Sequence, residues 1–239
     1  MISLELAKEK RTGIIQILLI TGLIGALYVL LNYKVRGDAL LNMPISPMDA
    51  LLTQLYGMIM ILNVFALIVA TCITFNMEYS GLAIKKMYIL PTCLWKMYLS
   101  KFLIIIGGFL IAVIIQNAAL LWIGYTKLEG GMFQMGMLMK YSIYTYITSL
   151  PVISFMLLIS SAIDKIWVTL GTGVAGFLSA MALSQTQSPV IQLHPFLLMF
   201  KPAMGSTAEI NVYTIIVSLI ETGLYFAIGA ILLERKNLE

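Results

Sequence analysis

Charged residues fall into short clusters that leave six long uncharged stretches along the chain. The stretches cover residues 12–33, 50–77, 102–126, 141–163, 166–200 and 210–233, and only Glu221 interrupts the last of them. A membrane-spanning helix needs about 20 apolar residues, so each stretch is long enough to span a bilayer. Because none of them alternates between apolar and polar residues, barrel strands are not expected.

This pattern predicts an all-α polytopic membrane protein with six transmembrane helices. The predicted helices cover residues 13–32, 51–76, 102–124, 141–162, 166–184 and 212–233. No connection between them is long enough to bury a core of its own. The whole chain, residues 1–239, is therefore expected to form a single transmembrane domain.

Composition supports this fold class and excludes the others. Hydrophobic residues make up 60% of the chain and charged residues only 11%, against about 25% charged in soluble domains. Soluble, disordered and fibrous proteins are excluded. The formal net charge of +4 is read as a sign of orientation and of anionic lipid, not of nucleic acid.

Orientation follows from the basic residues in the connections. With the N-terminus inside, ten of the 15 Lys and Arg residues lie in inner segments and five in outer ones. Inner loops carry the excess of positive charge, so both termini are expected in the cytoplasm. The first apolar stretch lacks a small-residue cleavage site, which argues against a signal peptide.

Residues that carry enzyme or metal chemistry are scarce. The two cysteines, Cys72 and Cys93, fit neither a disulfide framework nor a Cys-x-x-Cys pair, and His194 is the single histidine. No Gly-x-x-x-x-Gly-Lys-[Ser/Thr] loop is present to bind ATP phosphates. We expect no metal, no cofactor in this chain and no enzyme activity of its own.

Two polar segments lie on the predicted inner side. Residues 1–12 mix apolar and charged positions, which favours an interfacial helix on the inner membrane surface over a solvated tail. Residues 77–101 form the longest inner connection, and Pro91 predicts a break between two short helices. The first of these helices would place Leu82 and Met87 on an apolar face beside the basic pair Lys85 and Lys86. An ordinary positively charged loop is the alternative.

The same connection ends in residues suited to the headgroup layer. Trp95 and Tyr98 offer aromatic rings, and Lys96 and Lys101 have long stems that can reach the interface. We predict that these four residues anchor the start of the third helix.

In its order of residues, this connection resembles the cytoplasmic connection of type-2 ABC exporter permeases. The residues that carry the resemblance are Glu78, Gly81, Lys85-Lys86, Leu90-Pro91, Trp95 and Lys101. Chain length and the Met- and Ile-rich character are similar to permeases of lantibiotic-immunity and related antimicrobial-peptide exporters. Such permeases export or expel amphipathic peptides across the bacterial plasma membrane and confer self-immunity or resistance.

The resemblance also implies partners and site residues. A coupling helix would dock onto separate nucleotide-binding ATPase subunits, which hold the ATP and Mg, and a second permease, identical or a sister subunit, would complete the transporter. Glu78 and Gly81 would open the coupling helix, the Lys85-Lys86 pair would lie near the ATPase groove, and Pro91 would end the helix. Leu82 and Met87 would supply the apolar contact.

The fifth connection, residues 185–211, is apolar enough to re-enter the bilayer. It carries Pro189, His194 and Pro195, and backbone at that depth would need protein neighbours to satisfy it. A hydrophobic loop on the outer headgroups is the alternative. His194 beside Pro195 is interpreted as a turn residue, not a ligand.

Glu221 is the one ionisable residue well inside a predicted span. An acid there costs about 2.5–3.5 kcal/mol on insertion scales, so it must face the bundle interior. Asn63, Gln116 and Asn117 are the expected hydrogen-bond partners. Interhelical hydrogen bonding is favoured, and a role in a substrate path or proton relay stays open. An ion-coupled secondary transporter or a membrane scaffold is the alternative function.

Overall fold

The computed structural model describes residues 2–41, 43–80, 94–128, 132–184, 191–205 and 207–235. These residues form helices joined by short turns, with no strand in any of the described ranges. Six helices are long and apolar enough to cross a membrane. The predicted all-α, six-span membrane fold is confirmed.

The six long helices extend beyond the predicted spans at half of their ends. The described helices are α1 (Ile2–Thr12), α2 (Ile14–Leu41), α3 (Pro47–Gln54), α4 (Tyr56–Ser80), α6 (Leu94–Lys127), α7 (Met135–Ala162), α8 (Ile166–Leu183), the 3-10 turn η1 (Ile191–Leu193), α9 (Pro195–Met204) and α10 (Val212–Arg235). Charge marks where a helix leaves the hydrocarbon, not where it stops. Helix α2 accordingly continues past Lys34 and Arg36 into the predicted connection.

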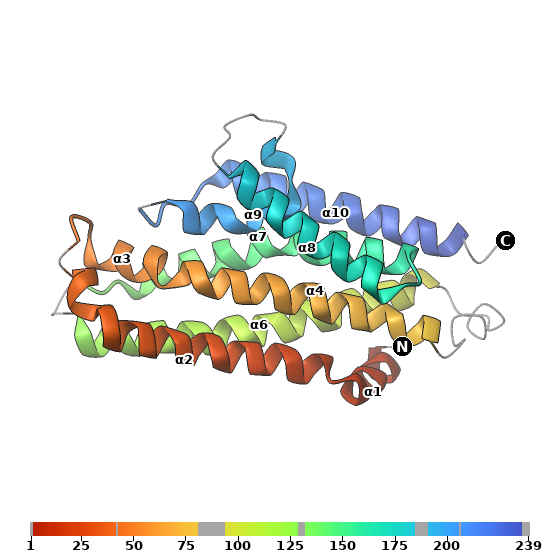
Figure 1. Ribbon diagram of the computed structural model, residues 1–239, viewed down its shortest axis with the longest axis horizontal. Helices are drawn as coiled ribbons and strands as arrows, with labels where there is room; N and C mark the ends of the chain where they lie inside the picture. The colour runs from red at the N-terminus through yellow and green to blue at the C-terminus, as the bar shows by residue number, and fades with distance from the viewer. Residues whose placement is uncertain are drawn as a thin grey trace.

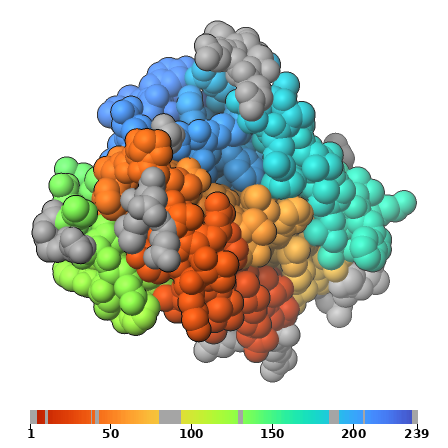
Figure 2. Space-filling model, turned by 60° about the vertical axis from the view of Figure 1, so that its left-hand side comes forward, coloured from red at the N-terminus to blue at the C-terminus, as the bar shows by residue number. Residues whose placement is uncertain are grey.

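The long helices lie side by side along one axis, with α1 turned away from α2 at one end (Figure 1). We call this the N-terminal end of the bundle, and α10 also finishes there. The most extensive packing among the described helices joins α7 to α10 and α2 to α6. In the space-filling view of Figure 2, α8 forms one flank and the α6–α7 pair the other.

Glycine at one position allows the close contact between α2 and α6. A Cβ added at Gly22 would lie 2.9 Å from the backbone Cα of Ala112, closer than side chains can approach. Small residues let membrane helices pack backbone to backbone. The two helices therefore depend on Gly22 for their separation.

The end of the bundle opposite α1 is closed by a capped helix. Ser46 caps α3, since its Oγ accepts from the Asp49 amide at 3.1 Å and donates to Asp49 Oδ2 at 2.7 Å. Pro47 follows at the first helical position, where no N–H is needed. Asp49 Oδ1 in turn accepts from the Ala208 amide at 2.9 Å, which fixes the segment after α9 against α3.

Helix α9 lies within the predicted re-entrant segment. His194 occupies its N-cap position and Pro195 its first turn, as expected for a turn residue before proline. Phe196 and Met199 are fully buried, and the helix packs on α7, so its backbone has protein neighbours. Its depth in the bilayer stays a prediction, and Pro189 lies outside the described residues.

Candidate functional site

A buried lysine organises the N-terminal end of the bundle. Lys101, in the second turn of α6, is 1% exposed. Its Nζ lies 3.0 Å from Glu78 Oε1, 3.0 Å from Glu5 Oε2 and 3.7 Å from Glu9 Oε1. All three carboxylates are themselves buried. The four side chains come from α1, α4 and α6, and we call them, together with Lys8, the ion cluster.

Lys8 supplies the second positive charge of the ion cluster. Its Nζ lies 2.8 Å from Glu5 Oε1 and 3.3 Å from Glu78 Oε1, and its side chain is half-exposed. Lys101 also donates to the Thr74 carbonyl at 3.3 Å. Three acidic side chains thus surround two ammonium groups. Lys101 is buried within the bundle, and Lys8 lies at its surface.

Burial and charge act in opposite directions on these groups. Burial raises the pKa of Glu5, but the charges of Lys101 and Lys8 outweigh it and hold the pKa below its ordinary value. Burial raises the pKa of Glu9 above its ordinary value, against the smaller effect of Lys101. For Lys8, burial lowers the pKa, and Glu5 and Glu78 more than compensate. The ion cluster therefore shifts the pKa of Glu5 down and that of Glu9 up, although both side chains approach the same lysine.

The ion cluster lies where α4 ends and α6 begins. Glu78 lies two residues before the end of α4, and Lys101 lies near the start of α6. These helices flank residues 81–93, the middle of the predicted coupling connection 77–101. The ion cluster therefore joins α1 to both ends of that connection, and removing one partner of a buried ion pair costs about 3–5 kcal/mol.

Of the predicted coupling residues, only Glu78 is in the described part of the chain. Gly81, Leu82, Lys85, Lys86, Met87 and Pro91 lie outside the described residues. The predicted interfacial helix at residues 1–12 corresponds to α1. Its Glu5 and Glu9 side chains are buried against the bundle, and its place on the membrane surface stays a prediction.

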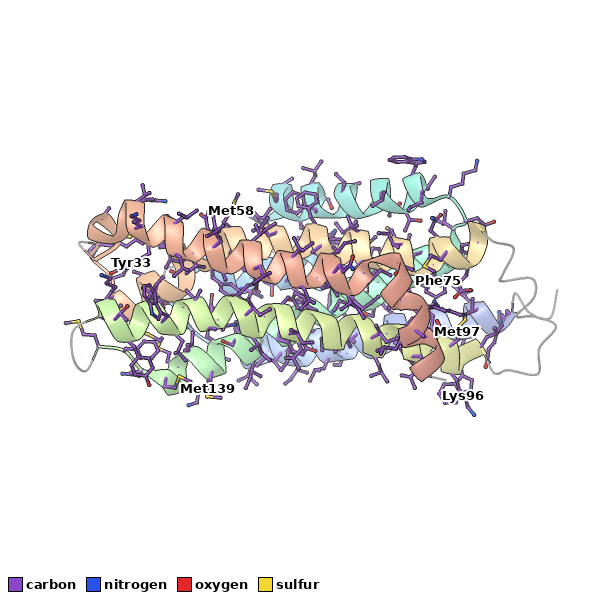
Figure 3. The ribbon with its side chains drawn as sticks, turned by 90° about the horizontal axis from the view of Figure 1, so that it is seen from below. Tyr33, Met58, Phe75, Lys96, Met97 and Met139 are labelled. Atoms are coloured by element: carbon purple, nitrogen blue, oxygen red, sulfur yellow. The ribbon has the colours of Figure 1, made fainter. Side chains whose placement is uncertain are left out.

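The predicted interfacial anchors divide into two groups. Trp95 and Lys96 are exposed, with Lys96 Nζ 5.9 Å from the Trp95 ring, and Lys96 points away from the bundle in Figure 3. The prediction is wrong for Tyr98 and Lys101, which are fully buried. Helix α6 begins at Leu94, earlier than the predicted residue 102, and turns these two side chains inward.

Tyr98 packs between aromatic rings. Its ring centre lies 5.9 Å from that of Phe75 on α4 and 5.3 Å from that of Phe226 on α10. A Cβ at Gly229 would overlap the Tyr98 hydroxyl, so α10 approaches α6 closely here. Phe75 also lies 5.5 Å from Lys101 Nζ, and Figure 3 shows it beside α1. Aromatic rings of α4, α6 and α10 therefore pack next to the ion cluster.

The polar groups inside the bundle pair differently from the prediction. Asn63 and Gln116 exchange two hydrogen bonds, of 3.1 and 2.8 Å, between α4 and α6. Asn117 accepts from the Ser142 hydroxyl at 2.7 Å and donates to the Val113 carbonyl. The expected bonds to Glu221 are absent from the described residues, because these amides are satisfied by each other and by neighbouring groups.

The described residues contain no candidate metal site. No group of three His, Cys, Asp or Glu side chains there could hold an ion. His194 Nε2 pairs with the Ser179 hydroxyl at 3.1 Å, and Cys72 is a buried free thiol.

Comparison with known protein families places most of the chain in one family. The sequence model of the ABC-2 family transporter protein matches residues 1–176. The matched part contains the ion cluster and the predicted coupling connection. Neither the curated proteins nor the solved structures gave a match. The chain belongs to the ABC-2 family and is a multi-pass membrane component of an ABC transporter, a transport subunit in a family that lacks the ATPase domain.

Proposed function

We propose that this chain is the permease of an ABC exporter that removes an amphipathic antimicrobial peptide from the bacterial plasma membrane. Such an exporter gives lantibiotic-type self-immunity or resistance. Family membership supports the permease role. The peptide cargo is proposed from the Met- and Ile-rich character of the chain, since flexible methionine surfaces adapt to bulky apolar ligands.

In this proposal the N-terminal end faces the cytoplasm and receives the force of ATP hydrolysis. ATPase subunits, which hold the ATP and Mg, dock on residues 81–93, with Leu82 and Met87 as apolar contacts and Lys85 and Lys86 beside the ATPase groove. A second permease completes the transporter. The observation that carries the coupling role is the ion cluster, which joins both ends of this connection to α1.

Co-purification tests the proposal. The chain is expressed with a candidate ABC-type ATPase subunit, as wild type and with Leu82→Asp or Met87→Asp. Wild type is expected to retain the ATPase. Each Asp variant should retain at least tenfold less ATPase, because a charge placed in an apolar contact must be desolvated. Met132→Asp, at an exposed position in the opposite connection, is the control. Full retention by both variants would refute the contact.

Cargo is tested separately by ATP-driven release of a labelled cationic amphipathic peptide from vesicles. Release that depends on ATP and on the ATPase supports the export role. Release without nucleotide would instead indicate the alternative, an ion-coupled secondary transporter. Normal ATP hydrolysis with no release of the peptide would refute the peptide cargo while leaving the ABC permease role intact.

A further inference from the structure

Helices α7 and α10 run parallel and in register. Tyr144 on α7 lies beside Thr214 on α10, and the rings of Phe155 and Tyr225 are 5.3 Å apart. The two contacts are separated by the same number of residues on both helices (144 to 155 and 214 to 225). Positions seven residues apart return to the same helix face, so Pro151 and Glu221 lie at the same level of this interface.

Glu221 lacks the partners that a buried acid needs. It is 7% exposed, and its Oε2 is buried with no hydrogen-bond partner among the described residues. At the same level, Pro151 lies inside α7 and has no N–H to give to the Ile147 carbonyl. This level of the interface therefore carries a buried carboxyl oxygen without a hydrogen-bond partner, beside a helical turn that lacks the N–H of Pro151.

A cavity opens one turn away from Glu221. The next pair along the interface, Phe155 and Tyr225, lines a cavity of about 670 Å³ whose other walls come from α8 and from the η1–α9 segment. Phe155 and Phe196 pack edge to face there, with ring centres 6.1 Å apart. One helical turn is about 5.4 Å, which the four-carbon stem of a lysine can bridge.

Among the described residues, no Lys or Arg lines the opposite wall of the cavity. Burial lowers the pKa of His194 and so disfavours its charged form. Its Nε2 is held by Ser179. The first turn of α9, at Pro195 and Phe196, brings the positive end of a helix dipole to this wall, which suits a carbonyl oxygen of a bound peptide.

We propose that this cavity binds an apolar peptide segment that carries a primary ammonium group, with Glu221 as its counter-ion. The rings of Phe155 and Tyr225 would stabilise the passing cation through their π faces. The inference rests on the proposed export of an amphipathic peptide and names the chemistry of the cargo group that this subunit recognises.

Binding of two matched probes tests the site. The full chain is placed in phosphatidylcholine nanodiscs, and two dansyl-labelled dodecyl chains are compared, one ending in a primary amine and one in an alcohol. Wild type is expected to bind the amine at least tenfold more tightly. Glu221→Gln should abolish this preference with little change for the alcohol. Glu209→Gln, an exposed acid in the preceding connection, should leave the preference intact.

A second variant tests the cavity itself. Ala175 on α8 lines the cavity, and Ala175→Phe should weaken both probes at least fivefold by filling it. An amine preference that persists in Glu221→Gln, or affinities unchanged in Ala175→Phe, would overturn the proposal. These outcomes are independent of the proposed function, because ATP-driven peptide release is measured on the assembled wild-type transporter without either probe.

Discussion

Lys101 Nζ and Glu78 Oε1 lie 3.0 Å apart, both buried, on the two helices that flank residues 81–93. Glu5 of α1 binds the same lysine at 3.0 Å. A displacement of the coupling connection must therefore either move α1 with it or separate buried ions. Because separation is costly, we expect α1 and the two flanking helix ends to move as one body.

Replacing the central lysine should destabilise this end of the molecule. Lys101→Met leaves Glu5 and Glu78 buried without their main counter-ion, at a cost of about 3–5 kcal/mol. The measurement is the thermal unfolding midpoint of the purified protein. Lys96→Met, at an exposed position on the same helix, should change it little. Equal midpoints for the two variants would mean that the ion cluster contributes nothing to stability.

Two glutamates of the ion cluster should show opposite pH dependence. The lowered pKa of Glu5 stabilises the fold above its unfolded value of 4.5, and this stability is lost as pH falls through the folded pKa. Glu5→Gln should therefore cost about 1–3 kcal/mol at pH 7, and the difference from wild type should shrink in acid.

Glu9 should behave in the reverse sense. Its raised pKa stabilises the fold below 4.5, and this stability is lost as pH rises through the folded pKa. Glu9→Gln mimics the protonated acid, so it should raise the unfolding midpoint at pH 8 and match wild type in acid. Unfolding curves of the two variants between pH 4 and pH 8 provide the check. Parallel pH profiles of the two variants would contradict the opposite directions of the two pKa shifts.

The gaps between charges were enough to predict six spans, because insertion depends mainly on apolar length. They could not predict that Lys101 is buried. A lysine at the edge of an apolar stretch looks like an interfacial anchor, and its carboxylate partners, Glu5 and Glu78, come from distant segments. Only the packing of α1 against α4 and α6 brings these charges together.

The reciprocal amide pair should show strong coupling in a double-mutant cycle. Asn63→Leu or Gln116→Met alone leaves a buried amide without its partner, which should lower the free energy of unfolding by about 1–3 kcal/mol. The double variant removes both polar groups and should cost less than the sum of the two. Membrane hydrogen bonds of this kind contribute about 0.6 kcal/mol on average. Strictly additive unfolding free energies would contradict the pairing.

Sequence pattern identified the intramembrane polar residues but not their partners. Side-chain depth can be estimated from position, whereas partner choice depends on which helix faces meet. Asn63 pairs with Gln116, whereas Glu221 Oε2 has no hydrogen-bond partner among the described residues. Glycine substitutions test this packing directly, because a single added methyl group reports on the separation of two helices.

Gly22 and Gly107 should respond oppositely to alanine. The added Cβ at Gly22 meets the Ala112 backbone, and Gly22→Ala should force α2 away from α6 and lower the unfolding midpoint. At Gly107 nothing lies within 4 Å, so Gly107→Ala should be neutral or stabilise by up to about 1 kcal/mol through helix propensity. A more harmful Gly107→Ala would contradict the observed helix contacts.

The central claim is that an ATPase drives this permease through the N-terminal end of the bundle. Photo-crosslinking in intact membranes tests it most directly, with a photoreactive residue at position 87 in the coupling connection or at position 132 in the opposite connection. The account predicts an ATPase crosslink from position 87 and none from position 132. A crosslink from position 132 alone, or no ATPase crosslink from position 87, would contradict it.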